Sequence, residues 1–151
     1  MSITPITSIL ELVMIVKNSG EVLRKCLKSV KPYIDHWTIL DTGSIDNTKD
    51  IIMEELEGIN GNLYQEDFID FSTTRNRAFE LASKSCKYMI VLDDSYELIG
   101  GKKLKSYLQN EDNLSFCIKI GNSHGNILEN YYYSLRIVKS NSNAYKANIL
   151  I

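Results

Sequence analysis

The alternation of apolar runs with stretches of helical periodicity is the strongest constraint on how this 151-residue chain folds. Residues 12–16, 37–40 and 88–92 are almost entirely apolar, which is typical of strands covered on both faces. Residues 62–65 form a weaker strand candidate between the second and third runs. Strands that alternate with helices in this way predict an α/β domain with a mostly parallel sheet and helices on both faces.

Helical periodicity occupies the three gaps between these strands. The first helix is expected over residues 22–30, because Pro32 stops it soon afterwards. The second is expected from about residue 46 to residue 56. The third begins where Ser72 offers an N-cap and reaches about residue 84.

The pattern changes after the last apolar run. Residues 102–108 predict a short basic helix, and residues 114–120 predict a strand. The Gly- and Asn-rich residues 121–126 are typical of a turn, and residues 131–138 predict a returning strand. We therefore expect a short antiparallel C-terminal hairpin and, with no repeat or linker, a single domain over residues 1–151.

Composition excludes several classes of protein. The chain is 44% hydrophobic and 24% charged, which argues against a disordered protein. A membrane helix needs about 20 apolar residues, and no such stretch occurs, while residues at the start lack the pattern of a signal peptide. We expect a cytoplasmic location and no membrane span. Cys26, Cys86 and Cys117 form no C-x-x-C pair, and we expect them to be packed, reduced thiols.

Charge argues against nucleic-acid binding. Residues 41–70 carry nine acidic side chains and only one basic side chain, Lys49, whereas a nucleic-acid face needs a continuous basic stripe. His124 lies in the expected turn and is predicted to be exposed. Residues 131–133 are three tyrosines along a strand, so one face is expected to be core, with sugar or base stacking as the alternative.

Polar residues follow the strands at the edge where open parallel sheets bind ligands. Asp41 comes directly after the second strand, where it could accept hydrogen bonds from a ligand, although a turn and helix start also account for this segment. Asp93 and Asp94 follow the strand at 88–92, and their mutual repulsion would be relieved by Mg²⁺ or Mn²⁺, or by solvation of the loop. Arg75, early in the third helix, suits phosphate or carboxylate, or lies on the surface. No Gly-x-Gly-x-x-Gly or P-loop pattern follows a strand, which argues against NAD and FAD.

Several motifs occur in order along residues 12 to about 97. They are V-K-N at 16–18, a Leu-x-x-x-Leu-x-Ser-Val helix at 23–30, D-T-G-S-I-D-N-T at 41–48, D-F-I-D-F-S-T-T-R-N-R-A at 67–78, and the strand that ends at Asp93-Asp94. Together they resemble the nucleotide-binding half of family 2 glycosyltransferases, which have the Rossmann-like GT-A fold. The resemblance implies a UDP-sugar as donor and Mn²⁺ or Mg²⁺ as cofactor.

The resemblance also implies roles for individual residues. Val16 and Asn18 would lie beside the nucleobase, Asp41 would contact the uracil or ribose, and Arg75 would approach the nucleotide. Asp93 and Asp94 would hold the ribose and the metal on the diphosphate.

The chain departs from the family pattern in two places. The family's D-x-D-[DE] run has its metal ligand at the second acidic position, where this chain has Ser95. Either Asp94 takes the metal or metal binding is weak, and Glu97 is a reserve candidate. Inverting members carry an acidic catalytic base after a segment like 136–147, but residues 148–151 contain no carboxylate. We therefore leave the catalytic base unassigned and expect the N-terminal fragment of a longer chain.

The resulting hypothesis is a glycosyltransferase domain that transfers the sugar of a UDP-sugar to a protein or glycan acceptor, or hydrolyses it. One alternative is a degenerate, non-catalytic nucleotide-binding or interaction module. A receiver-like phosphoacceptor domain is a further alternative, since its acidic pair resembles Asp93-Asp94. In receivers, however, that pair follows the first strand, and no suitable later strand here ends in an Asp.

Overall fold

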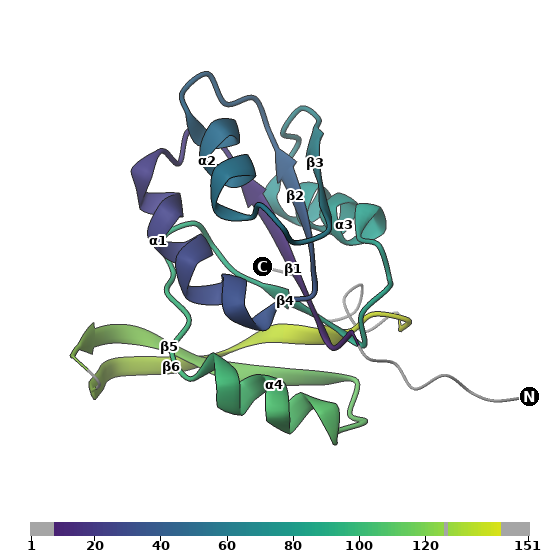
Figure 1. Ribbon diagram of the computed structural model, residues 1–151, viewed down its shortest axis with the longest axis vertical. Helices are drawn as coiled ribbons and strands as arrows, with labels where there is room; N and C mark the ends of the chain where they lie inside the picture. The colour runs from purple at the N-terminus through teal and green to yellow at the C-terminus, as the bar shows by residue number, and fades with distance from the viewer. Residues whose placement is uncertain (1–7, 126, 143–151) are drawn as a thin grey trace, which may run out of the picture.

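A single six-stranded sheet forms the centre of the molecule in the computed structural model, which describes residues 8–125 and 127–142 (Figure 1). Its strand order is β3-β2-β1-β4-β6-β5. The strands are β1 (Leu10–Val16), β2 (His36–Asp41), β3 (Gly61–Gln65), β4 (Tyr88–Val91), β5 (Ser115–His124) and β6 (Ile127–Lys139). The first four strands are parallel, while β6 pairs antiparallel with β4 and with β5. This confirms the predicted α/β class, with a parallel core and an antiparallel C-terminal pair.

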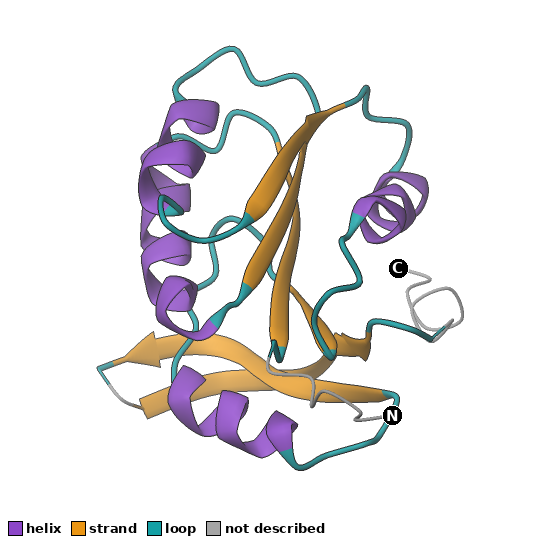
Figure 2. Ribbon diagram, turned by 45° about the vertical axis from the view of Figure 1, so that its right-hand side comes forward, coloured by secondary structure: helices purple, strands orange, loops and turns teal. Residues whose placement is uncertain are grey.

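Helices cover both faces of the parallel strands (Figure 2). The helical elements of the molecule are α1 (Glu21–Val30), the 3₁₀ turn η1 (Lys31–Tyr33), α2 (Thr48–Glu55), α3 (Phe71–Leu81) and α4 (Gly101–Gln109). Helices α1 and α2 lie on one face, α3 lies on the other, and α4 lies beside the β5–β6 pair (Figure 1). Among the described residues, no helix has the length and apolar character needed to cross a membrane.

Alternate residues of β1 divide the core into two layers. Leu12 and Met14 belong to the larger cluster, which includes Leu27 of α1 and Ile52 of α2. Val13 points the opposite way, into the smaller cluster around α3. This arrangement follows from the two-residue period of a strand, and it explains why the run at 12–16 contains no polar residue.

Helix α3 differs from the prediction at both ends. Its N-cap is Asp70 rather than Ser72, and the Asp70 carboxylate accepts a hydrogen bond of 2.7 Å from the Thr73 N–H. The helix ends at Leu81 rather than near residue 84, because Ser83 is held by the buried carboxylate of Glu11. The Ser83 N–H and hydroxyl donate to that carboxylate at 3.0 and 2.8 Å.

The C-terminal hairpin is longer than predicted. Strand β5 continues to His124 and β6 begins at Ile127, so the turn expected at 121–126 is mostly strand. A Cβ atom on Gly121 would lie 2.8 Å from the Glu129 carbonyl oxygen. Glycine at 121 therefore permits a close approach of two strands and does not mark a turn.

Two packing predictions are wrong for the same reason. Cys117 is exposed, although Cys26 and Cys86 are buried as expected. All three tyrosines at 131–133 are exposed as well, so neither face of this segment is core. The hairpin lies at the end of the sheet, where much of its surface has no helix over it (Figure 1). His124 is exposed, as predicted.

Candidate functional site at the carboxyl edge of the sheet

The loops after β1 and β2 are tied together at the carboxyl edge of the parallel strands. The Asn18 N–H donates to the Ser44 hydroxyl at 2.8 Å, and the Asn18 side-chain oxygen accepts from the Ile45 N–H at 2.8 Å. Asn18 has a φ of 48°, a left-handed conformation that asparagine tolerates better than most residues. Its side chain is thus committed to holding the two loops in place.

Asp41 lies beneath this loop pair and is fully buried. One carboxylate oxygen, Oδ1, accepts hydrogen bonds of 2.8 Å from both the Gly43 and Ser44 N–H groups. The other oxygen, Oδ2, is buried and has no hydrogen-bond partner among the described residues. Asp41 therefore builds the turn with one oxygen and leaves the other as an unused acceptor.

Val16 is buried and contributes its backbone to the same corner. Its carbonyl oxygen accepts hydrogen bonds from the Thr42 N–H at 2.9 Å and from the Thr42 hydroxyl at 3.2 Å. The Val16 side chain belongs to the larger core cluster. Val16 thus forms part of the floor beneath the two loops.

Two arginines converge on Asp93 at the end of β4. Arg75, from α3, donates from Nη2 to Asp93 Oδ1 at 3.0 Å. Arg136, from β6, donates from Nη1 and Nη2 to the two Asp93 oxygens at 3.3 and 3.2 Å. We call these three side chains the Arg–Asp–Arg cluster. With two guanidinium groups and one carboxylate, the cluster carries a net positive charge and can attract an anion such as phosphate.

Arg136 is the site residue that the sequence analysis did not identify. It lies 43 positions after Asp93, in the segment 135–139 that resembles the family more weakly than the earlier motifs and to which no role was assigned. The antiparallel register of β6 on β4 pairs Ile137 with Ile90, which puts Arg136 beside the end of β4. Its contact with Asp93 depends on this register and could not be read from the sequence.

Tyr96 packs against the Arg136 guanidinium, which lies 5.2 Å from the centre of the tyrosine ring. Burial, and then the hydrogen bond with Tyr132, raises the pKa of Tyr96 to about 12. Its hydroxyl therefore stays protonated at neutral pH and can both donate and accept hydrogen bonds.

Arg75 is only partly used within the cluster. Its side chain is 13% exposed, and its Nε–H is buried without a hydrogen-bond partner among the described residues. Burial lowers the pKa of Arg75, although Asp93 counteracts this, and an arginine remains charged at any physiological pH. Arg75 thus keeps donors that no described residue uses, within a positively charged cluster suited to a ligand oxygen.

Asp94 is oriented by the loop after β1. The Ser19 hydroxyl donates to its Oδ2 atom at 2.6 Å. Ser95 is exposed, and Glu97 forms an ion pair of 3.0 Å with Lys25 of α1. Across the described residues, no three His, Cys, Asp or Glu side chains are grouped to hold a metal. One oriented carboxylate still fits Mg²⁺ or Mn²⁺ that arrives on a diphosphate, because such ions commonly use one or two carboxylates plus substrate oxygens.

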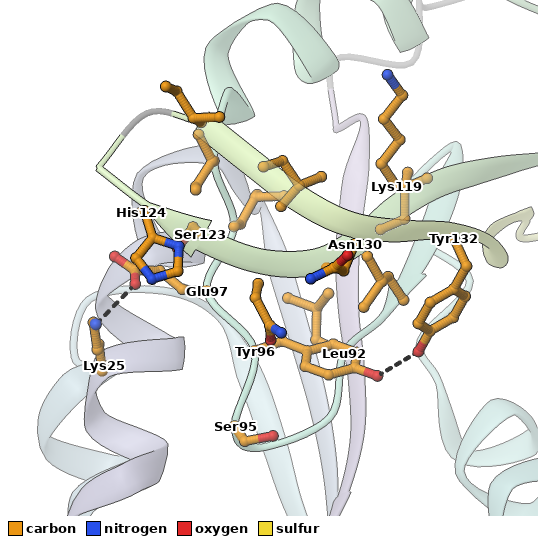
Figure 3. Close-up of a pocket in the computed structure, with 18 of the residues that line it drawn as sticks. Lys25, Leu92, Ser95, Tyr96, Glu97, Lys119, Ser123, His124, Asn130 and Tyr132 are labelled. Carbon is orange, nitrogen blue, oxygen red and sulfur yellow. Dashed lines mark hydrogen bonds and ion pairs between the residues drawn. The ribbon is translucent and has the colours of Figure 1, made fainter.

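A cavity of about 1070 Å³ adjoins the site (Figure 3). It lies between the loop after β4 and the β5–β6 hairpin, and Ser95 and Tyr96 line it on the loop side. The Tyr96 and Tyr132 hydroxyls lie 3.4 Å apart, and the Lys25–Glu97 ion pair borders the cavity elsewhere (Figure 3). A second molecule could therefore occupy space that shares a loop with the Arg–Asp–Arg cluster.

The structure thus brings some of the predicted residues into direct contact. Arg75 binds Asp93, and Asn18 is bonded to the turn that Asp41 supports. Asp94 is linked through Ser19 to the β1 loop, whereas Glu97 is engaged with Lys25.

Comparison with known proteins places the chain in a family. The model of the family Glycosyl transferase family 2 matches residues 11–146. A TPR repeat-containing protein of Synechococcus elongatus is 37% identical over 110 residues, which is 71% of this chain but 26% of that protein. The glycosyltransferase SunS of Bacillus subtilis prophage SPbeta is 35% identical over 83 residues, covering 55% of this chain and 19% of SunS. The chain therefore matches about a quarter or less of the length of these relatives.

Solved structures share the fold. Residues 1–349 of S. aureus TarS in complex with UDP-GlcNAc superpose with a TM-score of 0.55 at 19% identity, over 66% of this chain and 30% of that one. Another crystal structure of TarS 1–349 gives a TM-score of 0.54 over 66% and 31% of the two chains. This likeness confirms the GT-A type of fold expected from the sequence.

Proposed function

The chain belongs to glycosyl transferase family 2, and on that premise we propose that it binds a UDP-sugar with a divalent cation and transfers the sugar to an acceptor. The observation that carries the proposal is the Arg–Asp–Arg cluster beside Asp94, at the carboxyl edge of a parallel sheet. UDP-GlcNAc is bound by TarS, which has the same fold, and this supports a UDP-sugar as donor.

The uridine is assigned to the loops after β1 and β2. Asp41 Oδ2 is a buried acceptor without a partner in the described chain, and it suits an N–H or hydroxyl of the nucleoside. Asn18 holds the loop above it, and Val16 provides the apolar floor. These three residues would thus bind the nucleoside without carrying any positive charge.

The diphosphate is assigned to the positive cluster. Arg75 would donate to phosphate oxygens, and its charge would stabilise the negative charge that develops on the leaving diphosphate. Asp94, held by Ser19, would bind the Mn²⁺ or Mg²⁺, and Asp93 would face the ribose. The bound cation would supply Lewis-acid stabilisation of the same leaving group.

The reaction follows from this placement. An acceptor hydroxyl attacks the anomeric carbon and forms a new C–O bond, while the bond to the diphosphate breaks and UDP leaves with the electron pair. The acceptor proton passes to a base, which stays unassigned. Water in the acceptor's place gives hydrolysis of the donor instead. We place the acceptor, a protein or a glycan, in the cavity of about 1070 Å³ that shares Tyr96 with the site.

Calorimetric titration with UDP, with and without Mn²⁺, tests the proposal directly. We expect binding that Mn²⁺ strengthens, that is lost in Asp94→Ala, and that persists in the matched control Ser95→Ala. No UDP binding in either condition would overturn the proposal.

Turnover separates an enzyme from a non-catalytic module that keeps nucleotide binding. Release of UDP from a panel of UDP-sugars would identify the sugar and establish catalysis. UDP binding without release from any donor would favour the non-catalytic alternative.

A further inference from the structure

We infer that Arg136 is a positioning residue that holds the Asp93 carboxylate in place for the donor, whereas Arg75 is the arginine that contacts the donor itself. The inference rests on the proposed function, because it assigns separate tasks to the two arginines of the Arg–Asp–Arg cluster. It follows from how the N–H groups of each guanidinium are used.

All three guanidinium nitrogens of Arg136 already make hydrogen bonds within the protein. Its Nε donates to the Ser134 hydroxyl at 3.1 Å, and Nη1 and Nη2 take the two oxygens of Asp93. Nη2 also lies 3.4 Å from the Tyr96 hydroxyl. The side chain is 7% exposed. A buried guanidinium with two contacts to one carboxylate fixes the orientation of that carboxylate and has little left for a ligand.

Arg75, by contrast, uses few of its N–H groups. It makes one hydrogen bond to Asp93, and its buried Nε–H has no partner within the described chain. Because Nε is shielded from solvent, the donor that a phosphate oxygen can reach is Nη1, which is not shielded and makes no hydrogen bond within the described chain. The two arginines therefore differ in available donors although they share one carboxylate.

The Arg136–Asp93 ion pair also reduces the electrostatic repulsion between Asp93 and a bound diphosphate. A carboxylate beside a diphosphate repels it, and Asp93 is 37% exposed at this edge. Arg136 neutralises Asp93 from the buried side, which leaves the charge of Arg75 available to the phosphates. Asp93 can then accept a hydrogen bond from a hydroxyl group of the UDP-sugar without weakening the binding of its diphosphate.

A double-mutant cycle on UDP affinity in the presence of Mn²⁺ tests this division of tasks. Arg136→Gln and Asp93→Asn should each weaken UDP binding by about tenfold, the scale of one charged hydrogen bond. If Arg136 acts through Asp93, the double variant should bind no more weakly than Asp93→Asn alone. Arg136→Lys should give an intermediate loss, because it keeps the charge but not the two-point contact. Arg77→Gln, on the exposed side of α3, is the matched control and should bind normally.

The outcomes distinguish this inference from the proposed function. Losses that multiply in the double variant would show that Arg136 acts on UDP binding independently of Asp93, and would overturn the inference. Unchanged UDP affinity in Arg136→Gln would also overturn the inference. Absence of UDP binding by the unaltered chain would overturn the proposed function and the inference together. If Arg136→Gln does not fold, the same cycle is run with Ser134→Ala, which removes only the Nε partner, and a loss that persists in the Asp93→Asn background would again overturn the inference.

Discussion

At the scale of single residues, two of the predicted site residues each have a buried polar atom that lacks a partner among the described residues. These atoms are Oδ2 of Asp41, an acceptor, and Nε of Arg75, a donor. Leaving a buried polar group unpaired costs about 1–3 kcal/mol, which a suitable ligand would recover. Substitutions at these atoms should therefore alter binding more than folding.

The substitution Asp41→Asn distinguishes the roles of the two carboxylate oxygens of Asp41. The amide oxygen can still accept from the Gly43 and Ser44 N–H groups, while an NH₂ group replaces the unpaired acceptor. We expect UDP affinity to fall about tenfold with little change in melting temperature. Calorimetry and thermal unfolding would measure both, with the exposed Asp50→Asn as control. An Asp41→Asn variant that binds UDP as well as the unaltered chain would remove Asp41 from the site.

At the scale of elements, Asp35 joins three parts of the fold. Its carboxylate accepts from the Ile9 and Leu10 N–H groups at 2.8 and 3.2 Å, at the start of β1. Lys105 of α4 contacts the other oxygen at 2.8 Å. Burial tends to raise the pKa of Asp35, but the hydrogen bonds from Lys105, Ile9 and Leu10 outweigh it, so the pKa is lowered.

This lowered pKa predicts how stability depends on pH. A carboxylate whose pKa is lower in the folded state stabilises the fold fully above its unfolded pKa of about 4 and loses that contribution as the pH falls through the folded value. We therefore expect the free energy of unfolding to decrease on acidification below about pH 4. Asp35→Asn should show a shallower decrease in urea titrations over the same range. Parallel pH curves for the two proteins would contradict the assignment.

The long hairpin depends on close contact at Gly121. A Cβ there would meet the Glu129 carbonyl oxygen at 2.8 Å and the Tyr131 Cα at 2.9 Å, both backbone atoms that cannot rotate away. Gly121→Ala should lower the free energy of unfolding by about 1–3 kcal/mol, as overpacking typically does. Asn122→Ala, at the neighbouring exposed position, should have a small effect. Equal stability of both variants in urea denaturation would mean that the strands are not this close.

At the scale of the whole molecule, the site draws on residues from α3, β6 and the loops after β1, β2 and β4. For a metal ion, the described residues offer the Asp94 carboxylate, which Ser19 orients, and no group of three metal-binding side chains. Metal and nucleotide binding should therefore depend on each other. The sequence expectation of Mn²⁺ or Mg²⁺ stays a prediction that this dependence can test.

We expect Mn²⁺ to bind weakly to the protein alone and strongly once UDP is present, because the diphosphate supplies most of the ligands. Electron paramagnetic resonance of free Mn²⁺ in the presence of the protein, with and without UDP, would measure this. Magnesium should compete with manganese only in the ternary mixture. Tight Mn²⁺ binding without nucleotide would point to a protein-only metal site and contradict the prediction.

Local patterns in the sequence were sufficient for the order of the elements. The apolar runs around Met14, Ile39 and Ile90 predicted buried parallel strands, because each lies in a sheet covered on both faces. The predicted end of α3 was wrong, because it depends on Glu11, a residue some 70 positions away that holds Ser83. The length of the hairpin was underestimated, because a glycine that permits a close approach of two strands cannot be told from a turn glycine by sequence alone.

The sequence by itself determined the fold class, the family resemblance and the placement of Asp41, Arg75, Asp93 and Asp94 after or near strand ends. These features depend on local periodicity and on short motifs, which the chain carries within a few residues. The tertiary structure alone decided that Arg136 reaches Asp93 and that one oxygen of Asp41 accepts hydrogen bonds from the turn that follows it. Both depend on pairing, register and burial, because a contact across 43 positions of chain exists only once β6 has docked against β4.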